Sequence, residues 1–224
     1  MPLSSVVGAQ SIVQPGVCTS TTRPASPYDG QVIYETDTDR AMVYNGTGWV
    51  VLSTGRANPG GLDLVKAETS FSGVTSVTAD NVFTSAYTNY RILYRVGTSA
   101  SDGSIRSQLR VGGTAATTNY NVQGFYTDNT SNTPFRLSST TGFLFGDTKA
   151  SYEGYFILEL NSPAVATPTF LHHLTSTASG AYTSFIYYAT VQNHTTATAY
   201  DGISFFNGSG GNISGSYTIY GYAK

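Results

Sequence analysis

The histidines are the first side chains of this chain to consider as acids, bases or metal ligands. His172 and His173 are adjacent, and His194 lies in the Asn/Thr-rich segment 192–196, which is typical of a loop. Because successive residues of a strand point to opposite faces, His172 and His173 cannot jointly hold one metal ion. No metal-ligand spacing connects them to His194. We therefore expect structural histidines, no metal site and no cofactor.

Carboxylates are the second source of possible chemistry, because polysaccharide hydrolases use a pair of them about 5–10 Å apart. Glu153 and Glu159 share one face of a predicted strand, but their spacing in the sequence places them about 20 Å apart. Either could still pair with a carboxylate on another strand. The other carboxylates of this half of the chain are Glu68, Asp80, Asp102, Asp128, Asp147 and Asp201. We expect no catalytic residues and a non-enzymatic protein, with a cell-wall polysaccharide hydrolase as the alternative.

The remaining motifs point to turns. Residues 37–39, Asp-Thr-Asp, offer oxygens for Ca²⁺ but lack the glycine and the distal glutamate of an EF-hand loop. The glycine-rich segments 111–114 and 208–211 match no phosphate-binding pattern and do not open a helix. A single cysteine, Cys18, excludes an intrachain disulfide. These segments are therefore predicted to connect strands.

The composition favours β-structure and an unusually uncharged surface. Gly (24), Tyr (17) and Phe (11) are abundant, and charged residues make up only 11% of the chain, against about 25% in most proteins. A surface of this kind suits burial in an assembly or contact with neutral sugar. The net charge of -2 leaves no basic patch for nucleic acid. We find neither a signal peptide nor an apolar run long enough for membrane insertion, so synthesis in a cytoplasm is expected.

Turn-forming residues divide the chain into three parts. Residues 1–52 are predicted to form an extended arm and a β-meander, with strands at 31–36, 41–44 and 49–52. A Gly/Pro-rich linker follows at 53–64, and residues 65–224 form the head. So small a meander is marginal alone, so we expect it to pack on a neighbouring copy or on another protein.

The head shows strand after strand separated by turns. Residues 105–111 alternate apolar and polar side chains, as in a half-buried strand. Similar strands are expected at 69–77, 90–96, 120–126, 152–160, 167–175, 182–191, 203–206 and 214–222. No helix of ten residues is indicated. The head is therefore predicted to be all-β, a jelly-roll-like antiparallel β-sandwich.

Aromatic side chains near amides and hydroxyls are candidates for holding a glycan. The candidate ligand-binding residues lie in loop-rich segments and are Tyr120, Phe125, Tyr126, Asn129, Tyr200 and Asp201. The same residue types also suit a sandwich core or a trimer interface. Both interpretations stay open at this point.

Residues 22–49 resemble a motif of tail and fibre proteins of tailed bacteriophages, particularly those that infect actinobacteria. The residues that carry the resemblance are Arg23-Pro24, Pro27, Gly30-Gln31, Ile33 to Thr38, Val43-Tyr44, Gly46-Thr47 and Trp49. More loosely, segments 89–94 and 213–221 are similar to strands of phage virion domains.

The resemblance implies a virion structural protein, assembled in the host cytoplasm as a homotrimer with other virion proteins as partners. Arg23, Tyr34, Tyr44 and Trp49 are then expected to pack at the attachment site. The head of a tail-tip or fibre protein would project outward and contact a host-surface glycan. The alternative is a capsid fibre or decoration protein with the same architecture.

Overall fold

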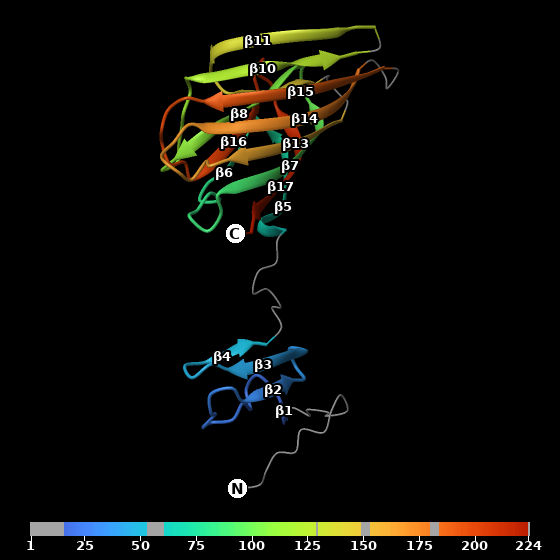
Figure 1. Ribbon diagram of the computed structural model, residues 1–224. Coiled ribbons are helices and arrows are strands. Elements are labelled where there is room, and N and C mark those ends of the chain that lie inside the picture. The colour runs from blue at the N-terminus through green and yellow to red at the C-terminus, as the bar shows by residue number, and fades with distance from the viewer. Residues whose placement is uncertain (1–15, 53–60, 129, 149–152, 180–183, 224) are drawn as a thin grey trace, which may run out of the picture. The chain divides into compact units, whose positions relative to one another are not determined.

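The computed structural model describes residues 16–52, 61–128, 130–148, 153–179 and 184–223, and it divides the chain into two compact units, Met1–Pro59 and Gly60–Lys224 (Figure 1). Every regular element in these ranges is a strand, so the all-β prediction is confirmed. The described ranges accordingly contain no apolar helix of membrane-spanning length. Most of the predicted linker and most of the predicted arm lie outside the described residues.

The N-terminal unit is a four-stranded sheet. Its strands are β1 (Gly16–Cys18), β2 (Val32–Glu35), β3 (Arg40–Tyr44) and β4 (Trp49–Val51), in that order across the sheet. The predicted meander is present as β2 to β4, and Gly30 and Gly46 take positive φ values in its turns. The described end of the predicted extended arm contributes β1 to this sheet, because its backbone pairs in parallel with β2.

The core of the N-terminal unit is very small. Its buried side chains, within residues 16–52, are Ile33, Met42 and Glu35, and the Glu35 carboxylate is only 1% exposed. Arg23 Nε donates to Glu35 Oε1 at 2.5 Å, and the Thr38 hydroxyl donates to the other carboxylate oxygen at 2.7 Å. Two apolar side chains bury too little surface for independent stability. The ion pair therefore organises much of this unit.

The head is a sandwich of two antiparallel sheets. Its strands are β5 (Leu62–Val74), β6 (Ser76–Ala79), β7 (Asn89–Ser99), β8 (Gly103–Val111), β9 (Thr114–Ala115), β10 (Tyr120–Thr127), β11 (Asn132–Thr140), β12 (Phe143–Thr148), β13 (Gly154–Asn161), β14 (Thr169–Ser179), β15 (Ser184–His194), β16 (Gly202–Asn207) and β17 (Ile213–Tyr222). It begins at Leu62 rather than at the predicted residue 65, because β5 pairs along its whole length with the last strand, β17.

The strand order is that of a jelly roll with two insertions. Strands β5-β17-β7-β13 lie opposite β6-β16-β8-β12, and the chain passes repeatedly between these two sets. The hairpins β10-β11 and β14-β15 are inserted after β8 and β13. They extend the first set into the eight-stranded sheet β11-β10-β15-β14-β13-β7-β17-β5, which faces the viewer in Figure 1. The short strand β9 pairs with β8 and completes a five-stranded sheet.

Aromatic rings fill the space between the two sheets. Tyr94 of β7 stacks on Phe205 of β16 with ring centroids 4.3 Å apart, and Phe156 of β13 lies 5.6 Å from Tyr94. Each such ring removes a large apolar area from water, worth about 2–3 kcal/mol. Burial also raises the pKa of the Tyr94 hydroxyl, which makes no hydrogen bond within the described ranges. The period-2 alternation of β7 and β13 places these rings inside.

A buried polar cluster also joins the sheets. Gln192 of β15 donates to the carbonyl oxygen of Leu144 at 2.6 Å and accepts from its N–H at 2.7 Å. Gln192 also donates to the Thr190 hydroxyl at 2.8 Å, and this hydroxyl contacts His173 Nδ1. The cluster ties β14 and β15 to β12 of the other sheet. It thereby fixes the position of the inserted hairpin β14-β15.

Candidate functional site

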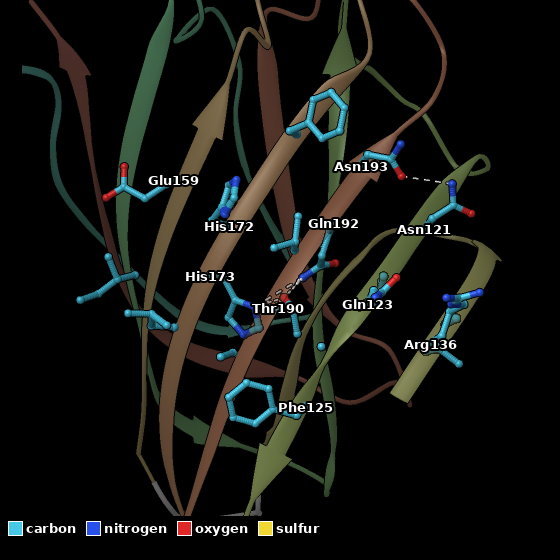
Figure 2. A pocket seen from close by; sticks show the side chains of 18 of the residues that line it. Asn121, Gln123, Phe125, Arg136, Glu159, His172, His173, Thr190, Gln192 and Asn193 are labelled. Carbon is cyan, nitrogen blue, oxygen red and sulfur yellow. Dashed lines mark hydrogen bonds between the residues drawn. The ribbon is translucent and has the colours of Figure 1, made fainter. Parts of the chain in front are cut away.

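A groove of about 1010 Å³ opens on the outer face of the eight-stranded sheet. Strands β7, β13, β14, β15, β10 and β11 all contribute lining residues, so the groove runs across the strands rather than along them (Figure 2). Most of it lies over the two inserted hairpins. The floor is therefore a continuous, fully paired piece of sheet rather than a set of loops.

Strand register arranges the outward side chains of this face in rows. One row, which we call the polar row, crosses six strands from β7 to β11 and consists of Arg91, Glu159, His172, Val191, Gln123 and Arg136. Its neighbour, the apolar row, crosses five strands and consists of Leu93, Ile157, Leu174, Ala189 and Phe125. Because directly paired residues lie about 5 Å apart, each row presents a nearly continuous band.

The carboxylate in the groove is fully engaged. Arg91 Nη2 lies 2.5 Å from Glu159 Oε1, and the Tyr222 hydroxyl donates to Glu159 Oε2 at 2.7 Å. The hydrogen bond that Arg91 donates to Glu159 raises the pKa of the Arg91 guanidinium. Glu159 thus accepts donors on both oxygens.

Glu153 lies in a second pair on the same sheet face. The Tyr155 hydroxyl donates to Glu153 Oε2 at 2.5 Å, and Arg95 pairs with Oε1. Hydrogen bonds from Tyr155 and Arg95 lower the pKa of Glu153. A glycosidase acid needs a raised pKa. Glu153 and Glu159, the two carboxylates that sequence placed on one strand face, are therefore each bound to an arginine.

Several polar side chains of the groove have no partner among the residues that the structure describes. Gln123, His172 and Arg136 make no hydrogen bond or ion pair with any described residue, and Figure 2 shows them around the groove. Asn121 and Asn193, in contrast, bond to each other through Nδ2 and Oδ1 at 3.1 Å. The polar row therefore offers an amide, an imidazole and a guanidinium to a bound molecule.

One prediction about the histidines is confirmed and another is wrong. His172 is exposed in the groove and His173 is buried on the other face, which confirms the prediction that they point apart. The prediction that His194 lies in a loop is wrong. It is the last residue of β15, buried beside the rings of Tyr120 and Tyr200, because β15 stays paired with its neighbours as far as this residue. Burial lowers its pKa.

The predicted ligand-binding residues are scattered over the head. Phe125 lies in the groove and is 44% exposed. Tyr126 is half-buried, with its ring 5.5 Å from that of Tyr188. Asp201 accepts a hydrogen bond from the Gly112 N–H at 2.9 Å. Asn129 lies outside the described residues.

Tyr120 and Tyr200 do not fit the role predicted for them. Both are buried in the core, and the Tyr120 hydroxyl donates to the carbonyl oxygen of Ala116 at 3.0 Å. Their rings fill the space between the sheets, so no surface is left for a ligand to contact. The sequence could not distinguish them from Phe125, because all three are aromatic residues beside polar ones.

The four predicted attachment residues all lie in the N-terminal unit. Arg23 binds Glu35, as described above, and the Tyr34 hydroxyl donates to Asp39. The rings of Tyr44 and Trp49 meet edge to face, with centroids 5.5 Å apart, on the paired strands β3 and β4. The structure thus brings Tyr44 and Trp49 together and pairs Arg23 with the buried Glu35 of the same unit.

Several groove residues were missed by sequence reasoning. The missed residues are Gln123, Arg136, Phe170, His172 and Asn193. Each occupies an outward position of an alternating strand, which was the available signal. Their meeting in one groove depends on the order β11-β10-β15-β14-β13, which no local pattern encodes.

The head and its groove define a class of protein, an all-β jelly-roll protein with a small N-terminal β-unit. Within the described residues, no cluster of three or more His, Cys, Asp or Glu side chains could hold a metal ion. Comparisons with protein-family models, curated proteins and solved structures found no match. The function is therefore inferred from the geometry of the two units.

Proposed function

We propose that this chain is a non-enzymatic structural protein of a tailed-phage particle. In this proposal the N-terminal unit attaches the protein to the particle, and the jelly-roll head projects outward and contacts the host surface. The motif residues that resemble phage tail and fibre proteins all lie in the N-terminal unit and around its sheet.

The incomplete core of the N-terminal unit carries this proposal. The unit buries only Ile33 and Met42 as apolar side chains in residues 16–52. It exposes four large apolar residues, which are Val17, Tyr28, Val50 and Leu52. A sheet of this size with more apolar surface outside than inside is stabilised when another protein covers it. Attachment supplies such a cover.

Packing of one copy on another would also bury the exposed apolar residues of the N-terminal unit. We propose that the protein is a homotrimer, with the N-terminal units of three copies packing together and against other virion proteins. The low content of charged residues, 11% of the chain, agrees with a surface that is largely enclosed in an assembly. In this proposal, particles are assembled in the host cytoplasm.

The head supports binding rather than catalysis. Glu153 and Glu159 are each paired with an arginine, while Gln123, His172 and Arg136 of the polar row have no partner in the described part of the chain. A hydrolase needs one carboxyl group that stays protonated near neutral pH, in addition to an ionised one. The groove supports such an arrangement poorly. It is well suited to hold a molecule without transforming it.

Immunogold labelling of intact particles with an antibody against residues 61–223 tests the proposal. Gold at the tail tip or on a fibre supports host contact by the head. Gold over the capsid assigns the protein to the capsid fibre or decoration class, which has the same architecture. Particles without gold, in a preparation where the antibody detects the free protein, would overturn the proposal.

A further inference from the structure

We propose that the groove on the eight-stranded sheet binds an extended polysaccharide that carries acidic groups. This inference rests on the host-contacting role of the head in the proposed function, and it names the ligand class and the residues of the site. The shape of the groove, its apolar surfaces and its charge favour such a ligand.

The shape of the groove fits a chain rather than a compact molecule. The groove crosses six strands, and strands lie about 4.8 Å apart, so it spans about 24 Å. Side chains that line it are exposed along its length, among them His172, Val191 and Gln123. A ligand that fills it must therefore be elongated and can leave the groove at both ends, as an internal stretch of a polymer does.

Two aromatic rings provide separate apolar platforms. Phe170 of β14 and Phe125 of β10 line the groove and are 46% and 44% exposed. Phe170 pairs in register with Asn193 of β15, and Asn193 pairs with Asn121 of β10. Phe125 lies on the same strand as Asn121, farther along it. This geometry separates the two phenylalanines by about 16 Å. Sugar rings present C–H faces that pack on such platforms, and a separation of this size requires successive rings of one chain.

The charge of the groove favours an acidic ligand. Arg91 and Glu159 neutralise each other at the β7-β13 side. Arg136, at the β11 side, is a cation without an anionic partner among the described residues, and Gln123 is paired in register with it. A guanidinium binds carboxylate or phosphate in a two-pronged geometry, and the neighbouring amide can bind hydroxyls. The groove therefore has one place for an acidic group beside places for sugar hydroxyls.

Other occupants fit less well. An extended peptide gains affinity by hydrogen bonding to a free strand edge, but β13, β14, β15 and β10 are paired on both sides. A second copy of this chain would place the charged polar row in the centre of the interface, where charged residues are normally depleted. The concave face would also require a convex counterpart. Neither objection applies to a hydrated, chain-like molecule.

Titration of the full-length protein with three polymers tests the inference. The probes are a polyuronate, a polyglycerol phosphate and a neutral β-glucan, measured by calorimetry at low and at high salt. We expect one acidic polymer to bind more tightly than the glucan and to weaken as salt rises. The two acidic probes distinguish a carboxylate ligand from a phosphate ligand.

Matched variants locate the binding. Phe125→Ala should weaken binding of the acidic polymer about tenfold or more, whereas Leu64→Ala, a change of an exposed apolar side chain on β5, should leave it unchanged. Arg136→Gln should abolish the preference for the acidic polymer, and Lys66→Gln on β5 should preserve it. These side chains are exposed, so an unchanged melting temperature would confirm that the fold is intact.

Three results would overturn the inference. Absence of binding to all three polymers at millimolar sugar concentration would do so, and particle labelling would then show whether the proposed function also fails. Binding that Phe125→Ala and Arg136→Gln leave unchanged would move the site elsewhere. A change in oligomer mass caused by the same two variants would make the groove a subunit interface.

Discussion

His173 Nε2 donates a hydrogen bond to the carbonyl oxygen of Phe145 at 2.8 Å, across the gap between the two sheets of the head. His173 Nδ1 contacts the Thr190 hydroxyl, which also accepts from Gln192. The proton on Nε2 leaves Nδ1 free to accept, so the neutral imidazole satisfies both contacts. Burial disfavours the charged form and lowers the pKa of His173 to about 4.

This buried imidazole predicts acid sensitivity of the head. The pKa in the folded state lies below the unfolded value of about 6.5, so the unfolded state binds more protons between these values. The neutral His173 therefore makes its full contribution to the unfolding free energy above pH 6.5. This contribution is lost as the pH falls toward 4. By pH 5 the loss from His173 is about 2 kcal/mol of unfolding free energy. Urea unfolding at pH 7.5 and pH 5 measures it.

Variants of the two adjacent histidines provide the control for this prediction. His173→Gln should reduce the pH dependence between 7.5 and 5, with a residual slope from His194, whose pKa burial also lowers. His172→Gln, on the exposed face, should leave the dependence as in the natural sequence. Equal slopes for both variants would show that His173 does not control acid stability.

Gln192 and Gln123 form a second matched pair. Gln192→Leu removes the partner of the N–H and the carbonyl oxygen of Leu144, and it leaves the Thr190 hydroxyl with one contact fewer. We expect a loss of about 3 kcal/mol in unfolding free energy. Gln123→Leu, at an exposed position where the side chain bonds to no described residue, should change it by less than about 0.5 kcal/mol. Similar losses for both would contradict the assigned role of the buried cluster.

Trp49→Ala tests attachment. The change removes the edge-to-face contact with Tyr44 on the small sheet and leaves the head untouched. We expect severalfold less protein in purified particles, measured by quantitative blotting against a major virion protein. The melting transition of the head should stay in place. Incorporation at the natural level would argue against a docking role for this part of the unit.

Arg23→Gln tests the ion pair of the N-terminal unit. The Glu35 carboxylate would keep its buried position and lose its cationic partner. We expect faster proteolysis within residues 16–52, while the head resists the protease as before. Arg40→Gln, an exposed change in β3, serves as the control. Equal cleavage rates for the two variants would show that the ion pair does not stabilise the unit.

Light scattering tests the proposed oligomer. The full-length protein should have about three times the chain mass of 23.8 kDa. Trp49→Ala should lower this mass if the N-terminal units hold the trimer together. A strict monomer at micromolar concentration would rule the homotrimer out.

The fold class followed from the sequence because its signals are local. Alternation at 105–111 and turn residues around it are sufficient to predict a half-buried strand, and β8 covers this range. The terminal strand was likewise predicted, although its pairing with β5 and β7 was not. Pairings of this kind join residues more than 100 positions apart, and neither composition nor periodicity specifies them.

The site was mostly beyond sequence reasoning for the same reason. Phe125 and Tyr120 belong to one strand, and a shift by one residue decides which face a side chain occupies. The predicted set therefore mixed an exposed ring with a buried one. His172 was correctly separated from His173, because that conclusion needed only neighbouring residues of one strand. Its place in one row with Gln123, on the far side of Val191, required the register of three strands.

The two faces of the inserted hairpins differ in how strongly the fold constrains their residues. On the inner face, His173 and Gln192 are fixed by hydrogen bonds with β12, and Thr190 is fixed by its contacts with these two side chains, so most changes there cost stability. On the outer face, the alternate residues of the same strands contribute little to the fold and can be exchanged nearly independently. A chain built in this way can change what it recognises by substitutions at every second position, and its framework does not need to be remade.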